Sequence, residues 1–151
     1  MEYELVYLEE KTVAGIRART NNFSPDMAQV IGGLWGKFYG EQIYESLPRK
    51  KGCKALGIYS GYENKEKGDY DITVACEVEE SGTLPDGVQL YKIPAGKYAK
   101  FIVKGELHEA VGEFWEQLWK MKLPRTFVCD FEEYQTKEAD KAEIHMYIGV
   151  K

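Results

Sequence analysis

One segment near the C-terminus places a carboxylate among aromatic residues at the spacing of a β-strand. In residues 128–134, side chains that alternate between two faces would put Asp130, Glu132 and Tyr134 on the same face. A carboxylate that is buried without a partner is costly, so it takes up a proton or attracts a cation. If an organic cation binds there, Glu132 supplies the counter-charge and aromatic rings supply cation–π contacts. The alternatives are that Glu132 lies on a solvated sheet face or pairs with a lysine.

Tryptophans are the second group of candidate ligand-binding residues. Trp35, Trp115 and Trp119 lie in two segments whose apolar residues recur at helical spacing. Trp35 and Trp115 occupy the apolar stripe of each segment, so packing in the core would also explain them. Trp119 follows Trp115 by one helical turn and widens the stripe toward an edge, where it could form the wall of a groove. We therefore keep all three as candidates for a pocket.

Tyr147 is a further candidate because of its place in the last predicted strand. Residues 143–150 alternate cleanly, and the even-numbered side chains form an apolar face. His145 and Tyr147 therefore point the other way. Tyr147 either lines a groove or flanks the sheet, whereas His145 has no nucleophile near it in the sequence and is predicted to be a surface histidine.

Two similar halves of the chain position these residues. An offset of 72 residues (134 − 62) places Tyr62 on Tyr134, and an offset of 80 (115 − 35) places Trp35 on Trp115. Each half reads as strand, helix, strand, strand, which predicts an α+β fold of two βαββ repeats related by a pseudo-two-fold axis. The repeats would share an antiparallel sheet, with two helices and a central ligand groove where they meet.

The offset of 72 also predicts what surrounds Glu132. It aligns Ser60 with Glu132 (132 − 60 = 72), and Leu56 and Ile58 would then lie on the face of Ser60. Because both are apolar, the sequence predicts that the carboxylate faces a partly apolar, buried or grooved surface.

The predicted boundaries follow from the same patterns. We expect a single domain over residues 1–151, with repeat one at about 1–80 and repeat two at about 86–151. The first helix is predicted to begin at Ser24-Pro25, and the second to end before Pro124. Strand regions are predicted at 4–19, 56–62, 70–78, 89–103, 125–134 and 143–150.

Composition weighs against several classes of protein. The formal net charge is −5, and the short basic run Arg49-Lys50-Lys51 is expected to be a solvated loop, so we predict no direct nucleic-acid binding. Three widely spaced cysteines and two histidines offer no metal site, and no cofactor motif is present. No apolar run reaches the length of about 18 residues that a membrane span needs, and the N-terminus lacks a signal-peptide pattern. We therefore expect a cytoplasmic protein without metal, cofactor or membrane contact.

Several motifs, taken in order along nearly the whole chain, resemble the GyrI-like small-molecule-binding family. They are Ile31-Gly32-Gly33-Leu34-Trp35, Leu56–Tyr59 with Gly68–Asp71, Ile93–Ala99, Phe131–Tyr134 and Met146–Val150. The resemblance implies two βαββ repeats and a groove for flat, hydrophobic, often cationic compounds, as in the effector-binding domains of multidrug-sensing regulators. It also implies that the family's central acid corresponds to Glu132 and that a tyrosine of its last strand corresponds to Tyr147.

The resemblance leaves three functions open. The first is a stand-alone binder of planar hydrophobic or cationic small molecules, for sequestration or protection, since we expect no helix-turn-helix segment. The second is an enzyme that hydrolyses cyclopropane-bearing DNA-alkylating toxins, with Glu132 and Tyr147 as its catalytic residues. The third is a protein-interaction module of the gyrase-inhibitor type, with DNA gyrase as the partner. The candidate ligand-binding residues are Glu132, Tyr134, Tyr147, Trp115, Trp119, Tyr62 and Trp35.

Overall fold

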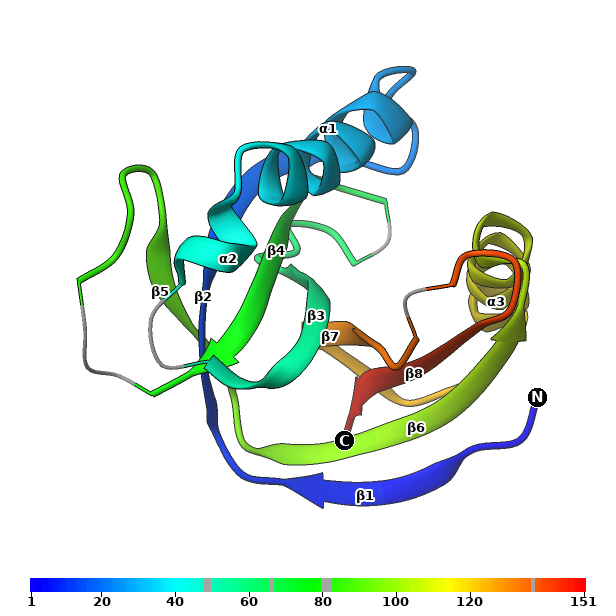
Figure 1. The fold of residues 1–151 in the computed structure, drawn as a ribbon. Coiled ribbons are helices and arrows are strands. Elements are labelled where there is room, and N and C mark those ends of the chain that lie inside the picture. The colour runs from blue at the N-terminus through cyan, green and yellow to red at the C-terminus, as the bar shows by residue number, and fades with distance from the viewer. Residues whose placement is uncertain (48–49, 66, 80–82, 137) are drawn as a thin grey trace.

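A single antiparallel sheet of eight described strands forms the fold in the computed structural model, which describes residues 1–151 except 48–49, 66, 80–82 and 137. The strands are β1 Glu4–Leu8, β2 Lys11–Thr20, β3 Lys50–Ser60, β4 Tyr70–Val78, β5 Gln89–Ile93, β6 Gly96–Gly105, β7 Arg125–Tyr134 and β8 Ala142–Val150. The helices are α1 Met27–Gly40, α2 Ile43–Ser46 and α3 Leu107–Lys120. Neighbouring strands follow the order β1-β6-β8-β7-β3-β4-β2-β5. The sheet is strongly curved, with α1 over one half and α3 beside the other (Figure 1), so the predicted α+β class is confirmed.

The helix α3 forms where the sequence places apolar residues at helical spacing. Phe114 and Leu118 lie four residues apart and are both buried, which turns one stripe of the helix toward the sheet. The side chain of Glu106 accepts a hydrogen bond from the backbone N–H of Glu109 (2.8 Å) and so caps the first turn. This helix is the one that carries Trp115 and Trp119.

The other helices differ in detail from the prediction. The helix α1 begins at Met27, later than the predicted Ser24-Pro25, because the Ser24 hydroxyl accepts from the Asp26 N–H (3.2 Å) in a turn that precedes the helix. The short helix α2 is not predicted by the sequence pattern. It follows Gln42, which adopts the left-handed conformation with φ of 58° and redirects the chain after α1.

The two halves of the sheet are arranged symmetrically about its central pair, β3 and β7. The strand β1 of the first half pairs with β6 of the second, and β5 of the second half pairs with β2 of the first. Each half therefore contributes an edge strand to the other half of the sheet. The strands β4 and β8 have nine residues each and correspond at an offset of 72 (142 − 70). The strand order therefore shows the pseudo-two-fold relation, whereas the repeat boundaries near residues 80 and 86 stay predictions.

Pairing registers correct the predicted alignment of β3 with β7. Leu56 pairs with Ala75 in β4, and the counterpart of Ala75 in β8, Tyr147 (75 + 72), pairs with Phe131. Leu56 therefore corresponds to Phe131, an offset of 75 (131 − 56) rather than 72. Register irregularities occur in β3 against β4 and in β7 against β8. Such irregularities break the constant offset that the sequence alignment assumed.

The corrected register changes which residues are equivalent. Gly57 corresponds to Glu132 (57 + 75), and Tyr59 corresponds to Tyr134 (59 + 75). Gly57 and Glu132 also pair directly with each other across β3 and β7, so the pseudo-two-fold axis passes through this pair. The prediction that Tyr62 is the counterpart of Tyr134 is therefore wrong.

The corrected register also changes the face on which apolar residues of β3 lie. Leu56 and Ile58 pack with Phe131 and Tyr147 in a buried cluster on the face opposite Glu132. The prediction that they share the face of Glu132 is wrong because the offset differs by three residues (75 − 72). A slip by an odd number of residues moves a side chain to the other face of a sheet.

Two further expectations concern surfaces and partners. Arg49 lies outside the described residues, and Lys50 and Lys51 begin β3 rather than a solvated loop. The Lys50 ammonium donates to the backbone oxygen of Tyr44 (3.0 Å) and lies 5.0 Å above its ring. Among the described residues, every helix is too short or too polar to span a bilayer.

Candidate ligand-binding site

Glu132 lies near the C-terminal end of β7, and only 2% of it is exposed. It pairs with Met146, which packs among the residues that α3 covers. Its Oε2 accepts a hydrogen bond from the Tyr134 hydroxyl, whereas its Oε1 is buried with no hydrogen-bond partner in the described part of the chain. The lysine nearby, Lys54, pairs instead with Glu133 at 3.9 Å. The structure thus shows neither a solvated Glu132 nor one paired with a described lysine.

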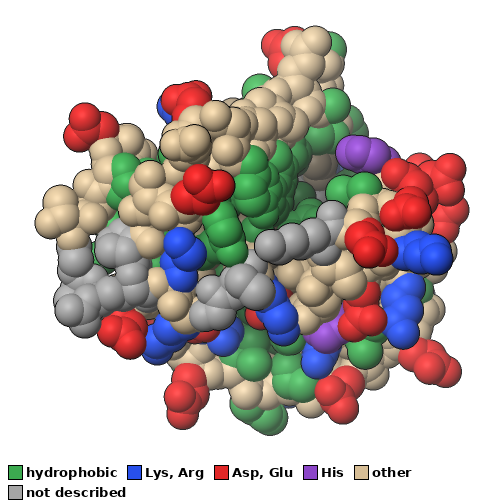
Figure 2. All heavy atoms as spheres, in the orientation of Figure 1, with side chains coloured by type: hydrophobic (Ala, Val, Ile, Leu, Met, Phe, Trp, Pro, Cys, Tyr) green, Lys and Arg blue, Asp and Glu red, His purple; other side chains and the backbone are tan. Residues whose placement is uncertain are grey.

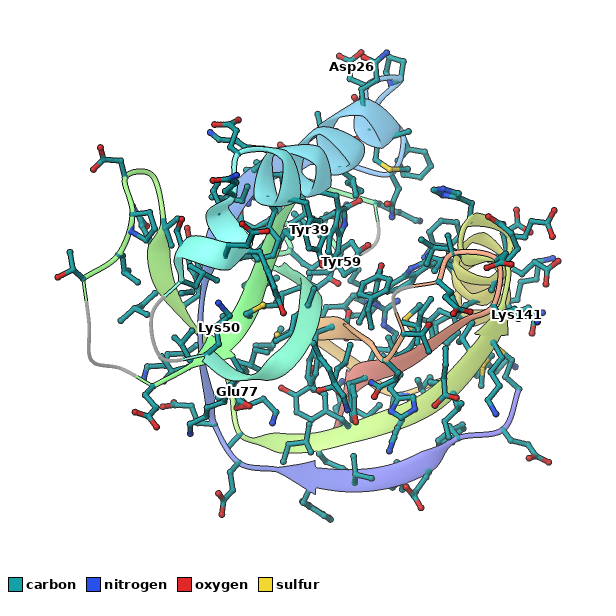
Figure 3. The ribbon with its side chains drawn as sticks, viewed as in Figure 1. Asp26, Tyr39, Lys50, Tyr59, Glu77 and Lys141 are labelled. Carbon is teal, nitrogen blue, oxygen red and sulfur yellow. The ribbon has the colours of Figure 1, made fainter. Side chains whose placement is uncertain are left out.

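Two aromatic pairs flank Glu132, one from each half of the sheet. Trp35 of α1 meets Tyr134 edge-on, with ring centroids 5.0 Å apart at 78°. Trp115 of α3 meets Tyr59 in the same way, 5.2 Å apart at 67°. Because Tyr59 corresponds to Tyr134 and Trp35 to Trp115, the axis through Glu132 relates the two pairs. Tyr59 lies below α1 near the centre of the molecule (Figure 3).

Gly57, the counterpart of Glu132, leaves room for the carboxylate. A Cβ at this position would lie 3.3 Å from Cζ2 of Trp35 and 3.5 Å from Oε2 of Glu132. A side chain here would therefore press on both neighbours. At the pseudo-two-fold axis one half contributes a glutamate and the other a glycine. Two carboxylates are therefore not buried next to each other, where their like charges would repel.

Burial controls the protonation of this cluster. It raises the pKa of Glu132 above its ordinary value, and the Tyr134 hydroxyl, with the polar groups of Tyr59 and Trp115 nearby, offsets the rise only in part. Burial and the neighbouring Glu132 also raise the pKa values of Tyr59 and Tyr134 well above 10, so both phenols stay protonated. The described groups that contact the carboxylate are therefore neutral.

A cavity of about 280 Å³ lies next to this cluster, between α1 and α3. Three of the sequence candidates, Tyr62, Trp115 and Trp119, line it. Hydrophobic side chains gather in the hollow between the two helices (Figure 2). Tyr59 and Trp115 line the cavity and also neighbour Glu132, so they form the wall between the cavity and the carboxylate.

Part of the cavity wall is polar. Arg125 donates from Nη2 to Oδ2 of Asp130 (2.8 Å), and the Tyr62 hydroxyl donates to the same oxygen (2.6 Å). The Tyr70 hydroxyl donates to Oδ1 of Asn22 (3.0 Å). Of these residues, all but Asp130 line the cavity. The cavity therefore combines aromatic walls with hydrogen-bonding groups.

Tyr147 is not brought to this site. It stacks on Phe131, with ring centroids 4.6 Å apart at 12°, and the Lys100 ammonium lies 5.9 Å above its ring. Its neighbour in β8, Met146, pairs with Glu132, and adjacent residues of a strand face opposite sides. Tyr147 therefore cannot act together with Glu132 in a groove or in catalysis.

The cavity-lining residues that sequence patterns missed include Tyr59, Tyr70 and Arg125. An alignment at an offset of 75 would have pointed to Tyr59 as the counterpart of Tyr134. Tyr70 reaches the cavity from the start of β4, and only its position beside Tyr59 in space (5.7 Å between centroids) reveals the link. Arg125 carries no sequence signal, because its contact with the cavity depends on how β7 enters the sheet.

Several solved structures share the fold of this chain. The integron cassette protein VCH_CASS2 from the mobile metagenome of Vibrio cholerae is 28% identical, with a TM-score of 0.74 over 97% of this chain and 95% of that one. SAV2435, in a structure bound to tetraphenylphosphonium, is 22% identical, with a TM-score of 0.82 over 100% and 94%. A putative transcription regulation protein from Staphylococcus aureus MU50 is 21% identical, with a TM-score of 0.74 over 99% of both chains. No curated protein matches the chain.

The family match agrees with the geometry of the fold. The family described as integron-associated effector binding protein, Cass2, matches residues 4–150. It is a GyrI-like family, which confirms the resemblance noted in the sequence. The chain therefore belongs to the Cass2 family of integron-associated effector binding proteins.

Proposed function

We propose that the protein binds amphipathic aromatic cations and that Glu132 is their counter-charge. The observation that carries this proposal is a buried carboxylate whose Oε1 has no hydrogen-bond partner among the described residues. A carboxylate in this state either stays protonated or receives a cation. Membership of an effector-binding family supports a small-molecule ligand, and tetraphenylphosphonium, bound by the similar SAV2435, is a lipophilic cation.

The aromatic pairs suit the same class of ligand. Rings around a desolvated cation add cation–π attraction of about 2 kcal/mol. The cavity of about 280 Å³ lies near the lower limit of small-molecule sites, so a bulky ligand needs more space. We infer that the wall formed by Tyr59 and Trp115 turns aside when a cation reaches Glu132. On this proposal the protein sequesters xenobiotic or toxic cations and so protects the cell.

The test is the pH dependence of tetraphenylphosphonium binding. This cation keeps its charge at every pH, so a change in affinity reports a group of the protein. Because burial raises the pKa of Glu132, we expect the affinity to be highest above that raised pKa and to fall as acidification protonates the carboxylate. Each pH unit below the pKa should weaken binding about tenfold until only the neutral-state affinity remains.

Tryptophan fluorescence or calorimetry at a series of pH values would measure this effect. Tetraphenylphosphonium affinity that stays constant across the range in which the protein is folded would contradict the counter-charge role. The variant Glu132→Gln is the internal control, because its affinity should be low and independent of pH.

Trp119 offers a separate test of the cavity. It lines the cavity yet is 47% exposed, so Trp119→Ala should change the free energy of unfolding by less than about 0.5 kcal/mol. We expect the variant to bind planar aromatic cations about fivefold to tenfold more weakly, because one aromatic face is lost. Tyr7→Ala is the matched control, since Tyr7 is an exposed aromatic residue on the edge strand β1. If the two variants bind planar aromatic cations with equal affinity, Trp119 does not belong to the ligand-binding site.

A hydrolase is the second candidate function, and the raised pKa of Glu132 favours it. A carboxylate of raised pKa can take a proton from water while the hydroxide formed attacks a cyclopropane carbon and opens the ring. The electron pair of the broken bond would move into the conjugated carbonyl of the toxin. Mass spectrometry of the compound after incubation separates the two functions: repeated formation of a water adduct, lost in Glu132→Gln, would establish the enzyme. The gyrase partner stays a prediction.

A further inference from the structure

One charged group of the cavity has no role in the proposed function. Arg125 lines the cavity, and only 7% of its side chain is exposed. Its Nε–H is buried with no hydrogen-bond partner in the part of the chain that the structure describes. A buried donor without an acceptor is costly, so the state in which the protein functions is expected to provide one.

Asp130 and Phe127 fix the position of this guanidinium. Nη2 of Arg125 donates to Asp130, and Cζ lies 4.1 Å above the Phe127 ring, whose edge in turn meets Tyr62. Asp130 already balances the charge of Arg125. The donor that remains therefore requires an uncharged acceptor oxygen rather than a second counter-ion.

This donor lies close to the site of the proposed cation. Asp130, which holds the guanidinium, and Glu132 are two residues apart on one face of β7, a separation of about 7 Å. The two unpartnered buried atoms of the described structure, Arg125 Nε and Glu132 Oε1, thus belong to side chains anchored at neighbouring positions. A single small molecule of that span would provide a partner for both atoms.

We propose that the ligand is an aromatic cation that carries a carbonyl oxygen on a short arm. Its cationic centre lies at Glu132, and its carbonyl oxygen accepts a hydrogen bond from Nε of Arg125. This inference rests on the proposed function, because the cation is held by the same carboxylate. A cation without an acceptor oxygen, such as tetraphenylphosphonium, pairs with Glu132 alone and leaves Nε of Arg125 without a partner.

A matched pair of probes tests the carbonyl. The compounds are (5-oxohexyl)triphenylphosphonium and hexyltriphenylphosphonium, which share the cation and the arm and differ in one carbonyl group. The wild-type protein should bind the ketone about tenfold more tightly, as for a hydrogen bond to a charged donor. Arg125→Lys keeps a cation beside Asp130 but removes the planar donor. We expect it to bind both probes with the affinity that the wild type shows for the hexyl compound.

Tyr70→Phe is the control at the same wall of the cavity, because it removes a hydroxyl while leaving Arg125 intact. It should keep the preference for the ketone. Equal wild-type affinities for the two probes would overturn this inference while leaving the proposed function standing. A preference that persists in Arg125→Lys, or that disappears in Tyr70→Phe, would overturn the role of Arg125. If neither probe binds the wild type, the proposed function itself fails.

Discussion

Replacing Glu132 with glutamine should weaken the binding of tetraphenylphosphonium at least about thirtyfold, which corresponds to about 2 kcal/mol. Glutamine keeps the shape of the side chain and can still accept a hydrogen bond from Tyr134. It removes only the charge, so the loss of affinity measures the counter-charge role of Glu132 directly. Calorimetric titration of both proteins at neutral pH is the measurement.

The same substitution should make the ligand-free protein more stable, by about 1 kcal/mol near neutral pH. The pKa of Glu132 is raised in the folded state, so the stability that its proton provides is fully present below the ordinary pKa of 4.5 and is lost as the pH rises through the raised value. The gain in unfolding free energy from Glu132→Gln should therefore vanish in acid and grow toward neutral pH. Chemical denaturation at several pH values would show this trend. A variant that is less stable at neutral pH would mean that Glu132 has a cation in the free protein.

Glu133→Gln is the matched control for both effects. Glu133 is the next residue in β7, lies on the opposite face and pairs with Lys54 and Gln135 near the surface. We expect its substitution to leave the affinity for tetraphenylphosphonium within about twofold and the stability within about 1 kcal/mol. If Glu133→Gln weakens binding as much as Glu132→Gln does, the effect comes from the net charge of the protein and not from the site.

Much of the fold could be predicted because local patterns coincide with the sheet. Residues 70–78 and 125–134 were predicted as strands and are β4 and β7 with the same bounds. The tryptophans of α1 and α3 also marked equivalent helices. The exchange of β1 and β5 between the halves could not be predicted from the sequence. An edge strand can pair with either half, and the turns and the curvature of the sheet determine which pairing forms.

The sequence predicted the acidic residue of the candidate site but only some of the residues around it. Glu132 was predicted because it shares a strand face with Tyr134 and because the resemblance implies that it is the family's central acid, and the structure buries it between Trp35 and Trp115. Tyr59 was missed because irregular pairing in β3 and β7 shifts the offset from 72 to 75, which no local pattern records. Tyr147 was predicted from strand alternation and from the resemblance, but the pairing of its neighbour Met146 with Glu132 places it on the other face, where it stacks on Phe131.

Asp130→Ala should cause the largest loss of stability of any substitution considered, about 3–5 kcal/mol in the free energy of unfolding. Asp130 is 0% exposed and accepts three hydrogen bonds, from Arg125 (2.8 Å), from the Tyr62 hydroxyl (2.6 Å) and from the backbone N–H of Gly149 (2.9 Å). Its removal leaves the buried guanidinium of Arg125 without a counter-charge. It also frees a donor in β8, so β7 loses a link to its neighbour.

Asp71→Ala is the control for this effect, because Asp71 pairs with Arg19 and Arg17 in an accessible network where ion pairs contribute about 0–1 kcal/mol. Urea denaturation of both variants and the wild type gives the comparison, with unchanged slopes expected. If Asp130→Ala costs no more than Asp71→Ala, then Asp130 does not hold Arg125 in place. The guanidinium would then be free to turn toward the cation site, where its positive charge would compete with any cationic ligand for Glu132.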